Sequence, residues 1–269
     1  MCCLFLAASS TVAIAQTSVV DLVNPIIGTN GMGHTFPGAC VPFGLVQLSP
    51  DTDTIPHNVD GKYQPRSYEY CAGYQHKDSS IVGFSHTHFS GTGHSDLGDI
   101  LIMPTTGTLK LNPGTATNPD GGYRSRFSHG TEISRPGYYE VMLTDYGVKA
   151  QLTTTQRVGI HKYTYPTNSE NQRIILDMIH GIYNYDGKVL WTNIRVENDT
   201  LVTGYRITNG WARTNYTYFA MSFSKPITHY GCEEKAKVNY RGGYAKFNMK
   251  ENFPDIGGRK IVAYFDFDP

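Results

Sequence analysis

The sequence has no excess of charge of either sign. Its 23 Lys and Arg residues balance its 23 Asp and Glu residues, and no run of basic residues occurs in the chain. Nucleic acids and anionic membranes are bound largely through clustered positive charge. We therefore expect no nucleic acid and no anionic membrane surface among the partners of this protein.

Long apolar runs are also missing, because no segment approaches the roughly 20 residues that a membrane-spanning helix needs. The start, "MCCLFLAASSTVAIAQTS", has a shorter apolar run followed by Ala13-Ile14-Ala15, the small-x-small pattern that precedes a signal peptidase site. We interpret residues 1–15 as a signal peptide and expect an exported protein, either periplasmic, on the cell surface or secreted. The segment lacks Lys and Arg, so we expect that the natural chain starts upstream of Met1. A short buried helix is the alternative.

Cysteines are few and irregularly spaced. Removal of residues 1–15 leaves Cys40, Cys71 and Cys232, an odd number without a C-x-x-C pair. This spacing gives no support to a zinc finger or a thioredoxin-like site, and it argues against a disulfide scaffold.

No window shows an amphipathic helical stripe with caps. Short β-prone runs broken by turn residues fill the chain instead, and many alternate apolar with polar residues, as in a strand with one buried face. The runs are residues 44–49, 79–85, 99–104, 137–155, 157–165, 172–179, 187–199, 200–210 and 215–224. The sequence thus predicts an all-β fold, a large antiparallel β-sandwich over residues 16–269. The last residues, "KIVAYFDFDP", read as a core strand, so we expect a domain truncated at its C-terminal end.

Histidines are concentrated in "VGFSHTHFSGTGHSDLGDI", which contains His86, His88 and His94 together with Asp96 and Asp99. The pattern is reminiscent of the H-x-H-x-D-H signature of zinc hydrolases. Five residues separate the second and third histidines, however, whereas the signature needs a tight turn that brings its ligands around a tetrahedral ion. We predict no metal ligands here, and histidines held by local hydrogen bonds are the simplest structural interpretation.

Three long stretches, taken in order, carry a resemblance. They are "DLVNPIIGTNGMGHTFPGACVPFGLVQLSPDT", "YCAGYQHKDSSIVGFSHTHFSGTGHSDLGDILIMP" and "SRPGYYEVML" with "VKAQLTTTQRVGIHKYTYP". From about Val23 to its last residue, the chain resembles the N-terminal domain of the glycoside hydrolase family 92 exo-α-mannosidases. The resemblance implies an exported enzyme whose β-sandwich is followed by an (α/α)₆ barrel, with the active site at the junction and a calcium ion that helps to distort the mannose.

The same resemblance implies that this chain holds no catalytic acid or base, because the family carries both on the helical domain. Asp96 and Asp99 are not expected to be that pair, since a three-residue offset on an extended strand points them to opposite sides. We expect them to anchor loop N–H groups. The implied partners are a mannose-containing glycan and the helical domain of the same polypeptide, and most calcium ligands are expected outside this chain.

The resemblance further implies that glycine-rich loops of this domain line the sugar pocket, and the candidate substrate-binding residues are Tyr68, His86, His88, His34 and Cys71. Glycines let the backbone approach a sugar, and a histidine ring offers one donor and one acceptor. For each histidine, plain loop structure remains the alternative to lining or supporting the pocket.

Tyr68 lies three residues before Cys71, at the position where many α-1,2-specific members of the family have Trp. This change leaves the linkage preference open, and Tyr68 could also be a packing residue. We expect Cys71 to be a small buried group and not a nucleophile. Arg157, His161 and Tyr163 follow a strand pattern and are expected to be scaffold.

A different class of function is the rival, namely a free-standing carbohydrate-binding module without catalysis. In that case Trp191 or Trp211 would provide the aromatic platform for a glycan.

Overall fold

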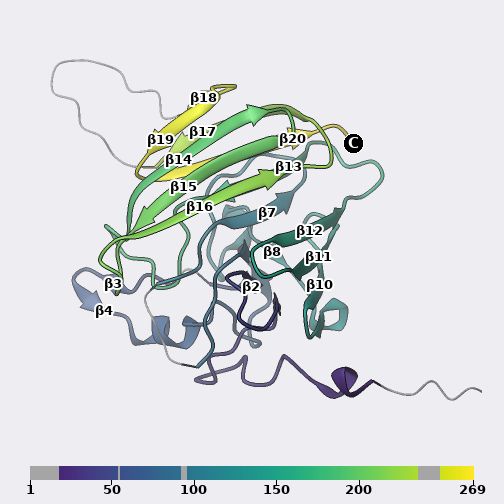
Figure 1. Ribbon diagram of the computed structural model, residues 1–269, viewed down its shortest axis with the longest axis vertical. Helices are drawn as coiled ribbons and strands as arrows, with labels where there is room; N and C mark the ends of the chain where they lie inside the picture. Colours follow the sequence, from purple (N-terminus) through teal and green to yellow (C-terminus); the bar gives the residue numbers. More distant parts are fainter. Residues whose placement is uncertain (1–17, 54, 92–95, 236–248) are drawn as a thin grey trace, which may run out of the picture.

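The computed structural model of this chain describes residues 18–53, 55–91, 96–235 and 249–269, and these fold almost entirely as β-strands (Figure 1). The expected signal peptide, residues 1–15, and His94 lie outside the described residues. None of the helices in the described part is long and apolar enough to cross a membrane.

An eight-stranded antiparallel sheet forms the centre of the molecule, with the spatial order β1-β2-β6-β7-β13-β20-β17-β18. Its strands are β1 (Ala39–Cys40), β2 (Gln47–Asp51), β6 (Gly83–Ser85), β7 (Leu101–Thr105), β13 (Gln172–Asp177), β17 (Ile227–Glu234), β18 (Met249–Glu251) and β20 (Ile261–Phe267).

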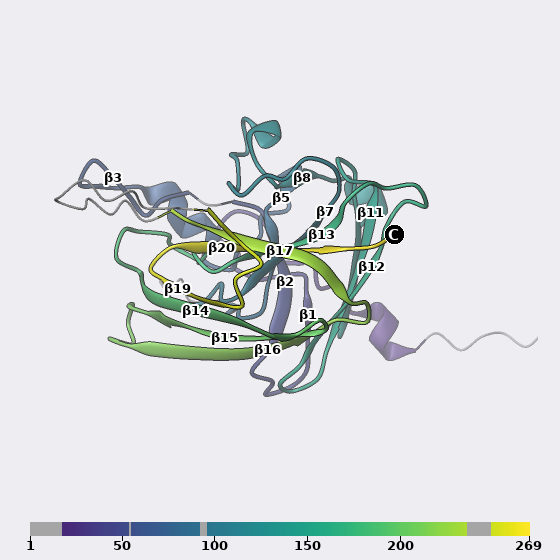
Figure 2. The same cartoon turned by 90° about the horizontal axis from the view of Figure 1, so that it is seen from above.

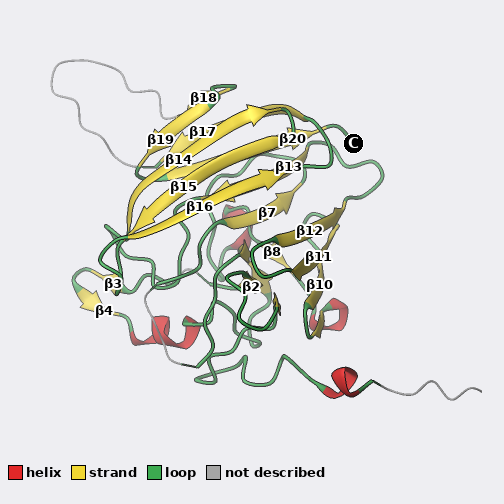
Figure 3. Cartoon of the chain, in the orientation of Figure 1, coloured by secondary structure: helices red, strands yellow, loops and turns green. Residues whose placement is uncertain are grey.

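Two four-stranded sheets accompany it, with the orders β12-β11-β10-β9 and β16-β15-β14-β19. Their strands are β9 (Ile133–Arg135), β10 (Tyr138–Leu143), β11 (Val148–Thr154), β12 (Gly159–Thr164), β14 (Val189–Asn198), β15 (Leu201–Thr208), β16 (Asn215–Ser222) and β19 (Asp255–Gly258). The small pairs are β3 (Asn58–Val59) with β4 (Lys62–Tyr63) and β5 (Ser80–Ile81) with β8 (Ser125–Arg126). Short 3₁₀ helices, red in Figure 3, are η1 (Val19–Leu22), η2 (Pro65–Tyr70), η3 (Pro119–Gly121) and η4 (His129–Thr131).

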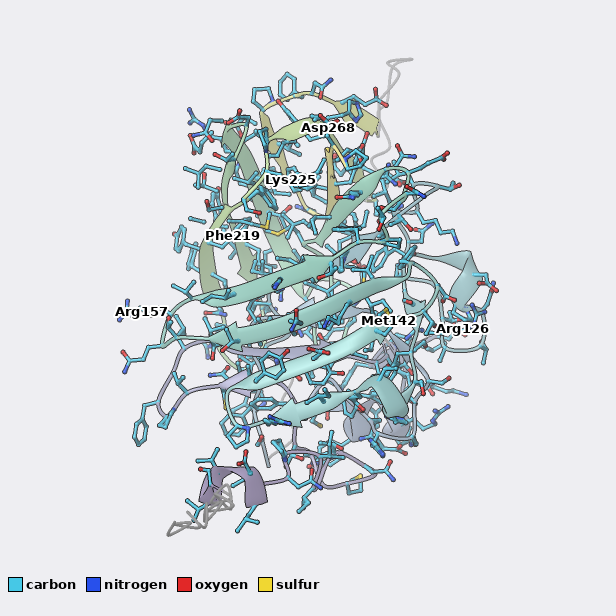
Figure 4. All side chains as sticks on the ribbon, turned by 90° about the vertical axis from the view of Figure 1, so that its right-hand side faces the viewer. Arg126, Met142, Arg157, Phe219, Lys225 and Asp268 are labelled. Carbon is cyan, nitrogen blue, oxygen red and sulfur yellow. The ribbon has the colours of Figure 1, made fainter. Side chains whose placement is uncertain are left out.

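The central sheet is covered on both faces, and alternate residues of its strands enter two separate cores. On β7, Leu101 and Met103 pack with the inner residues of β10 and β11, whereas Ile102 packs with those of β14 and β15. The strands β13 and β20 divide their side chains in the same way. Seen from above in Figure 2, β14, β15 and β16 form a layer beside β17 and β20, while β11 and β12 lie to the side. Figure 4 looks onto the β9–β12 sheet, with Met142 labelled on its outer face.

The predicted all-β antiparallel fold is therefore confirmed, with one difference in layering. We expected strands with a single buried face, but all five residues of β7 and all six of β13 are buried. Strands that are covered on both sides need apolar residues at nearly every position. The runs "LIMP" and "RIIL" have that composition, so they belong to the middle layer of a three-layer arrangement.

Two local predictions are also confirmed. The stretch 137–155 forms a β-hairpin, in which Leu143 pairs with Val148 across the turn. The glycine-rich residues 24–38 contain no strand and run as a loop along the lower edge of the molecule in Figure 1.

Candidate functional site

The glycine-rich loop and the histidine loop are joined to each other. The Gly91 N–H donates to the His34 carbonyl at 2.7 Å, and His34 Nδ1 lies 3.2 Å from the Gly91 carbonyl. His34 adopts a left-handed backbone with φ of 50° and is buried, yet its Nε2 has no hydrogen-bond partner. A buried ring nitrogen without a partner is costly for folding, and such an atom is a common feature of functional sites.

His34, Tyr68 and Cys71 come together at one end of the molecule. The Tyr68 ring, on η2, meets the His34 ring edge to face with centroids 4.8 Å apart. Cys71 follows η2 directly, and its buried thiol lies 2.6 Å from the Tyr68 carbonyl. Three of the five residues proposed from the sequence therefore lie together, on the side where η2 and the β3–β4 pair appear at the lower left of Figure 1.

Two aromatic residues that sequence reasoning missed complete this group. The Tyr183 hydroxyl lies 2.9 Å from the Cys71 sulfur, and the His57 ring meets the Tyr183 ring edge-on at 5.2 Å. Burial, together with Cys71, holds the pKa of Tyr183 well above its usual value, so its hydroxyl stays a neutral donor or acceptor. Tyr183 lies 112 residues from Cys71 and belongs to no motif, so no sequence signal could have found it.

The segment that carries Tyr183 is held by a buried lysine. The Lys188 ammonium donates to the Ile182 carbonyl, and the Ile182 N–H donates to the Leu97 carbonyl at 3.2 Å. Burial, with repulsion from Arg206, lowers the pKa of Lys188 to about 7. The lysine thus fixes the Tyr183 segment against the histidine loop at the cost of burying an ammonium group.

The side chain of His88 is completely buried. Its Nδ1 lies 2.7 Å from the Gln47 carbonyl and its Nε2 lies 2.8 Å from Asp51 Oδ1. Because a carbonyl and a carboxylate both only accept hydrogen bonds, both ring nitrogens must donate when Asp51 is ionised. In this conformation His88 can support the loop from below, but its ring does not reach the surface. Contact with a ligand stays a prediction.

Asp51 is the centre of this buried network, since its second oxygen, Oδ2, accepts from His180 Nε2 at 2.7 Å. Burial alone would raise the pKa of Asp51, but the neighbouring His88 and His180 rings hold it well below its usual value. The carboxylate therefore stays ionised and ties β2 to the histidine loop and to the segment after β13.

His86 points to a different part of the molecule. Its Nδ1 donates to the Ile100 carbonyl at 2.7 Å, and its Nε2 lies 3.0 Å from His161 Nε2 on β12, whose Nδ1 in turn meets the Tyr163 hydroxyl at 2.7 Å. Burial lowers the pKa of His86 to about 4 and that of His161 well below its usual value. His161 and Tyr163 lie on β12, as the strand pattern predicted, whereas Arg157 lies in the bend before this strand. His86 is bonded to His161, and a scaffold role for these residues stays a prediction. A substrate-contacting role for His86 stays a prediction.

The two aspartates of the loop have separate partners, and the expected role of Asp96 is confirmed. Asp96 accepts from the N–H groups of Trp211 and Ala212 at 2.9 and 3.2 Å. Asp99 differs from the prediction, because its buried carboxylate binds side chains instead. It forms an ion pair with Arg206 at 2.7 Å and accepts from the Thr87 hydroxyl at 2.7 Å.

In the part of the chain that the structure describes, no three or more carboxylates converge to offer the oxygen-rich site that calcium prefers. Calcium takes six to eight oxygen ligands. Within the described ranges, the only group of three converging Asp, Glu, His or Cys side chains is His76, His129 and Glu132, which offers two ring nitrogens and one carboxylate. We therefore derive no step through calcium from these residues.

Comparison with known proteins identifies the class and then the family. The model of the glycosyl hydrolase family 92 N-terminal domain matches residues 22–269. One similar solved structure is that of BT3965, an α-mannosidase of this family from Bacteroides thetaiotaomicron. Its sequence is 40% identical to this chain, and the two structures superpose with a TM-score of 0.79. The match covers 95% of this chain and 32% of that one. The protein is thus a member of a glycoside hydrolase class. The chain belongs to glycosyl hydrolase family 92, as its N-terminal domain.

Two further relatives agree with this assignment. The inverting mannosidase BT2199 of Bacteroides thetaiotaomicron VPI-5482 is 25% identical with a TM-score of 0.69, over 95% of this chain and 30% of that one. An uncharacterized secreted glycosidase of Arthroderma benhamiae is 28% identical over 170 residues, which are 60% of this chain and 19% of that protein. The chain thus spans about a third or less of the length of these relatives.

Proposed function

We propose that this domain supplies one wall of the substrate pocket of an exported, calcium-dependent, inverting exo-α-mannosidase that acts on mannose-containing glycans. The observation that carries the proposal is the convergence of His34, Tyr68, Cys71 and Tyr183 from three separate segments. This cluster combines aromatic rings, which can pack on sugar faces, with the buried Nε2 of His34, which has no hydrogen-bond partner. The mannoimidazole complex of the relative BT3965 supports mannose as the substrate class.

The chemistry itself is assigned to a helical domain outside this chain. An inverting glycosidase needs two carboxyl groups about 6.5–9.5 Å apart around the scissile bond, one to protonate the leaving group and one to activate water. Asp96 and Asp99, the acidic residues of the histidine loop, are already bound to backbone N–H groups and to Arg206. Most calcium ligands are likewise placed outside this chain in this proposal. Export is supported by the small-x-small pattern at the start and by the secreted relative.

The test uses the full-length protein, including the helical domain. We expect release of mannose from an α-mannoside, with the β-anomer appearing first by NMR, and loss of activity when a chelator removes calcium. Tyr68→Ala and His34→Ala are expected to lower kcat/KM about threefold to tenfold or more, because each removes one contact with a neutral sugar. His229→Ala, a half-exposed histidine on β17, is the matched control. Unchanged kinetics for both site variants would remove this cluster from the pocket.

A second candidate function is glycan binding by the outer face of the β14–β16 sheet. Trp191, Ile207 and Tyr216 are in register across three strands, and Tyr205 pairs with Tyr218 two residues further along. The Tyr216 and Tyr218 rings are exposed and nearly parallel, with centroids 6.4 Å apart. Trp211, the other candidate, is exposed on the loop between β15 and β16.

This module hypothesis is distinguished from the first by binding without catalysis. If it is correct, mannan in an affinity gel slows the migration of the 269-residue chain. The double variant Trp191→Ala/Tyr218→Ala should lose this retardation, whereas the control Tyr68→Ala should keep it. Migration that mannan does not alter would reject the platform.

A further inference from the structure

A histidine and a glutamate lie on the same side of a short turn, remote from the His34 cluster. His129 begins η4 and Glu132 caps it, with the Glu132 N–H donating to the His129 carbonyl at 3.2 Å. A 3₁₀ helix has three residues per turn, so side chains at i and i+3 eclipse each other. His129 Nδ1 accordingly lies 2.7 Å from Glu132 Oε2. The turn is the teal one beside β10 in Figure 1, at the lower right, whereas η2 is at the lower left.

The Glu132 carboxylate is held in place by two buried tyrosines. The hydroxyls of Tyr74 and Tyr139 donate to Oε1 at 2.8 and 2.7 Å. Oε2 lies 2.7 Å from His129 Nδ1 and also 3.0 Å from the Tyr74 hydroxyl, so both carboxylate oxygens have partners that fix their position. The carboxylate side chain is only 3% exposed, whereas the His129 side chain is 39% exposed. Hydrogen bonds of this kind, from surrounding groups to a metal-ligating carboxylate, fix its orientation in metal sites.

A second histidine reaches the same point from a different segment. His76 is held by its N–H, which donates to the Thr29 carbonyl at 2.8 Å, and its ring lies 4.0 Å from the His129 ring with an interplanar angle of 35°. One donor atom from each of His76, His129 and Glu132 lies within 4.8 Å of the others. Ligands around a tetrahedral zinc ion are about 3.3 Å apart, given bonds of about 2.0–2.1 Å. Zinc binding therefore requires the three donor atoms to move closer together, and His129 is the most exposed of the three residues.

The geometry points to a divalent transition-metal site formed by His76, His129 and Glu132, with Zn²⁺ as the ion that fits it best. Two imidazole nitrogens and one carboxylate oxygen are a set that zinc binds, with a fourth position open to water, whereas calcium and magnesium prefer oxygen ligands. A ligand atom must give up its proton to bind the ion, so zinc competes with the hydrogen bond between His129 Nδ1 and Glu132 Oε2.

The site joins two parts of the fold that are distant in sequence. His76 lies between η2 and β5, in the segment whose backbone bonds to the glycine-rich loop, while η4 precedes the β9–β12 sheet. A metal bound only by the folded chain stabilises it by mass action. Zinc is therefore expected to raise the thermal midpoint of this domain, independently of any glycosidase activity.

The experiment titrates ZnCl₂ into the chelator-treated, untagged 269-residue chain by calorimetry. We expect one saturable zinc per chain and a zinc-dependent rise in thermal midpoint. His76→Gln and His129→Gln are each expected to weaken zinc binding at least tenfold. His229→Gln, which removes another half-exposed histidine beside carboxylates, is the matched control and should bind zinc like the parent.

Two further readouts separate a lost ligand from a lost fold. Glu132→Gln keeps an oxygen acceptor for Tyr74 and Tyr139, so it should fold yet also bind zinc at least tenfold more weakly. Co²⁺ in the parent should give the visible absorption of a four-coordinate site, and this absorption should be missing in His129→Gln. No saturable zinc binding by the parent, or equal binding by the folded His76→Gln and His129→Gln variants, would overturn the assignment.

Discussion

At the scale of single residues, the histidine loop is defined by where each ring nitrogen finds its partner. His88 bonds to Asp51 and His86 bonds to His161, whereas His34, on the neighbouring glycine-rich loop, keeps a buried Nε2 without a partner. Adjacent positions of one motif therefore have different environments.

Gly73 lies against the buried network and is the residue whose substitution should disturb it most directly. Its φ is +81°, and a Cβ there would lie 1.9 Å from Asp51 Oδ1. Because His88 and His180 hold that carboxylate, Gly73→Ala is expected to cost about 2–5 kcal/mol in the free energy of unfolding. Gly61→Ala is the control, since its φ is +76° with nothing within 4 Å, and backbone strain alone should cost about 1–2 kcal/mol. Urea denaturation measures the free energy of unfolding of both variants. Equal losses would mean that Asp51 and its partners shift at no cost to accommodate the new methyl group.

The His86–His161 pair predicts how stability depends on pH. Burial lowers the pKa of His86 to about 4 and holds that of His161 well below its usual value. The unfolded chain therefore binds protons near pH 6.5, whereas the folded chain does not. Stability is therefore full above about pH 6.5 and falls as the pH drops toward 4, by on the order of 1–3 kcal/mol for His86. Asp51 contributes its loss only at lower pH, below its unfolded value of 3.8.

Denaturation curves between pH 7.5 and 4.5 check this expectation. His161→Gln retains a donor and an acceptor but cannot titrate, so it should flatten part of the slope. A free energy of unfolding that stays constant over this range would contradict the neutral assignment of the pair.

At the scale of elements, the outer β14–β16 sheet is tied to the central sheet by an ion pair as well as by apolar packing. Arg206 on β15 points inward with no exposed surface and binds Asp99, which lies two residues before β7. Burial would raise the pKa of Asp99, but Arg206 and the Thr87 hydroxyl outweigh it and lower the pKa. The pair also fixes the histidine loop, because Thr87 belongs to it.

Removing one partner of this pair should be costly. Asp99→Asn and Arg206→Met are each expected to lose about 3–5 kcal/mol, because the remaining group is left buried and unpaired, and the double variant should lose less than the sum. Arg126→Gln, which breaks the exposed ion pairs with Asp120 and Asp145, is the control and should change the free energy of unfolding far less. A double-mutant cycle in urea measures the coupling, and additive losses would show that the two groups act independently.

At the scale of the whole molecule, the loops of the candidate pocket converge from one end of a rigid three-layer scaffold. In the proposed function this wall positions a ligand, while Asp96 and Asp99, the carboxylates of the histidine loop, are bound to backbone N–H groups and to Arg206. We therefore expect the 269-residue chain to release no mannose from an aryl α-mannoside, with or without calcium, because no group replaces a proton donor and a water-activating base. Turnover that remains with the pure chain after repurification would refute this expectation.

The sequence by itself determined the all-β class, most strand positions, the 138–154 hairpin and the family, because turn residues, β-branched runs and ordered motifs are local signals. Only the tertiary structure decided that "LIMP" and "RIIL" lie between two layers, since a fully apolar run does not say what covers its second face. It also separated His86 from His88, and it joined Tyr183 to Cys71 across 112 residues. Partners of side chains are set by strand register and layer packing, and these depend on contacts between segments that are far apart in the chain.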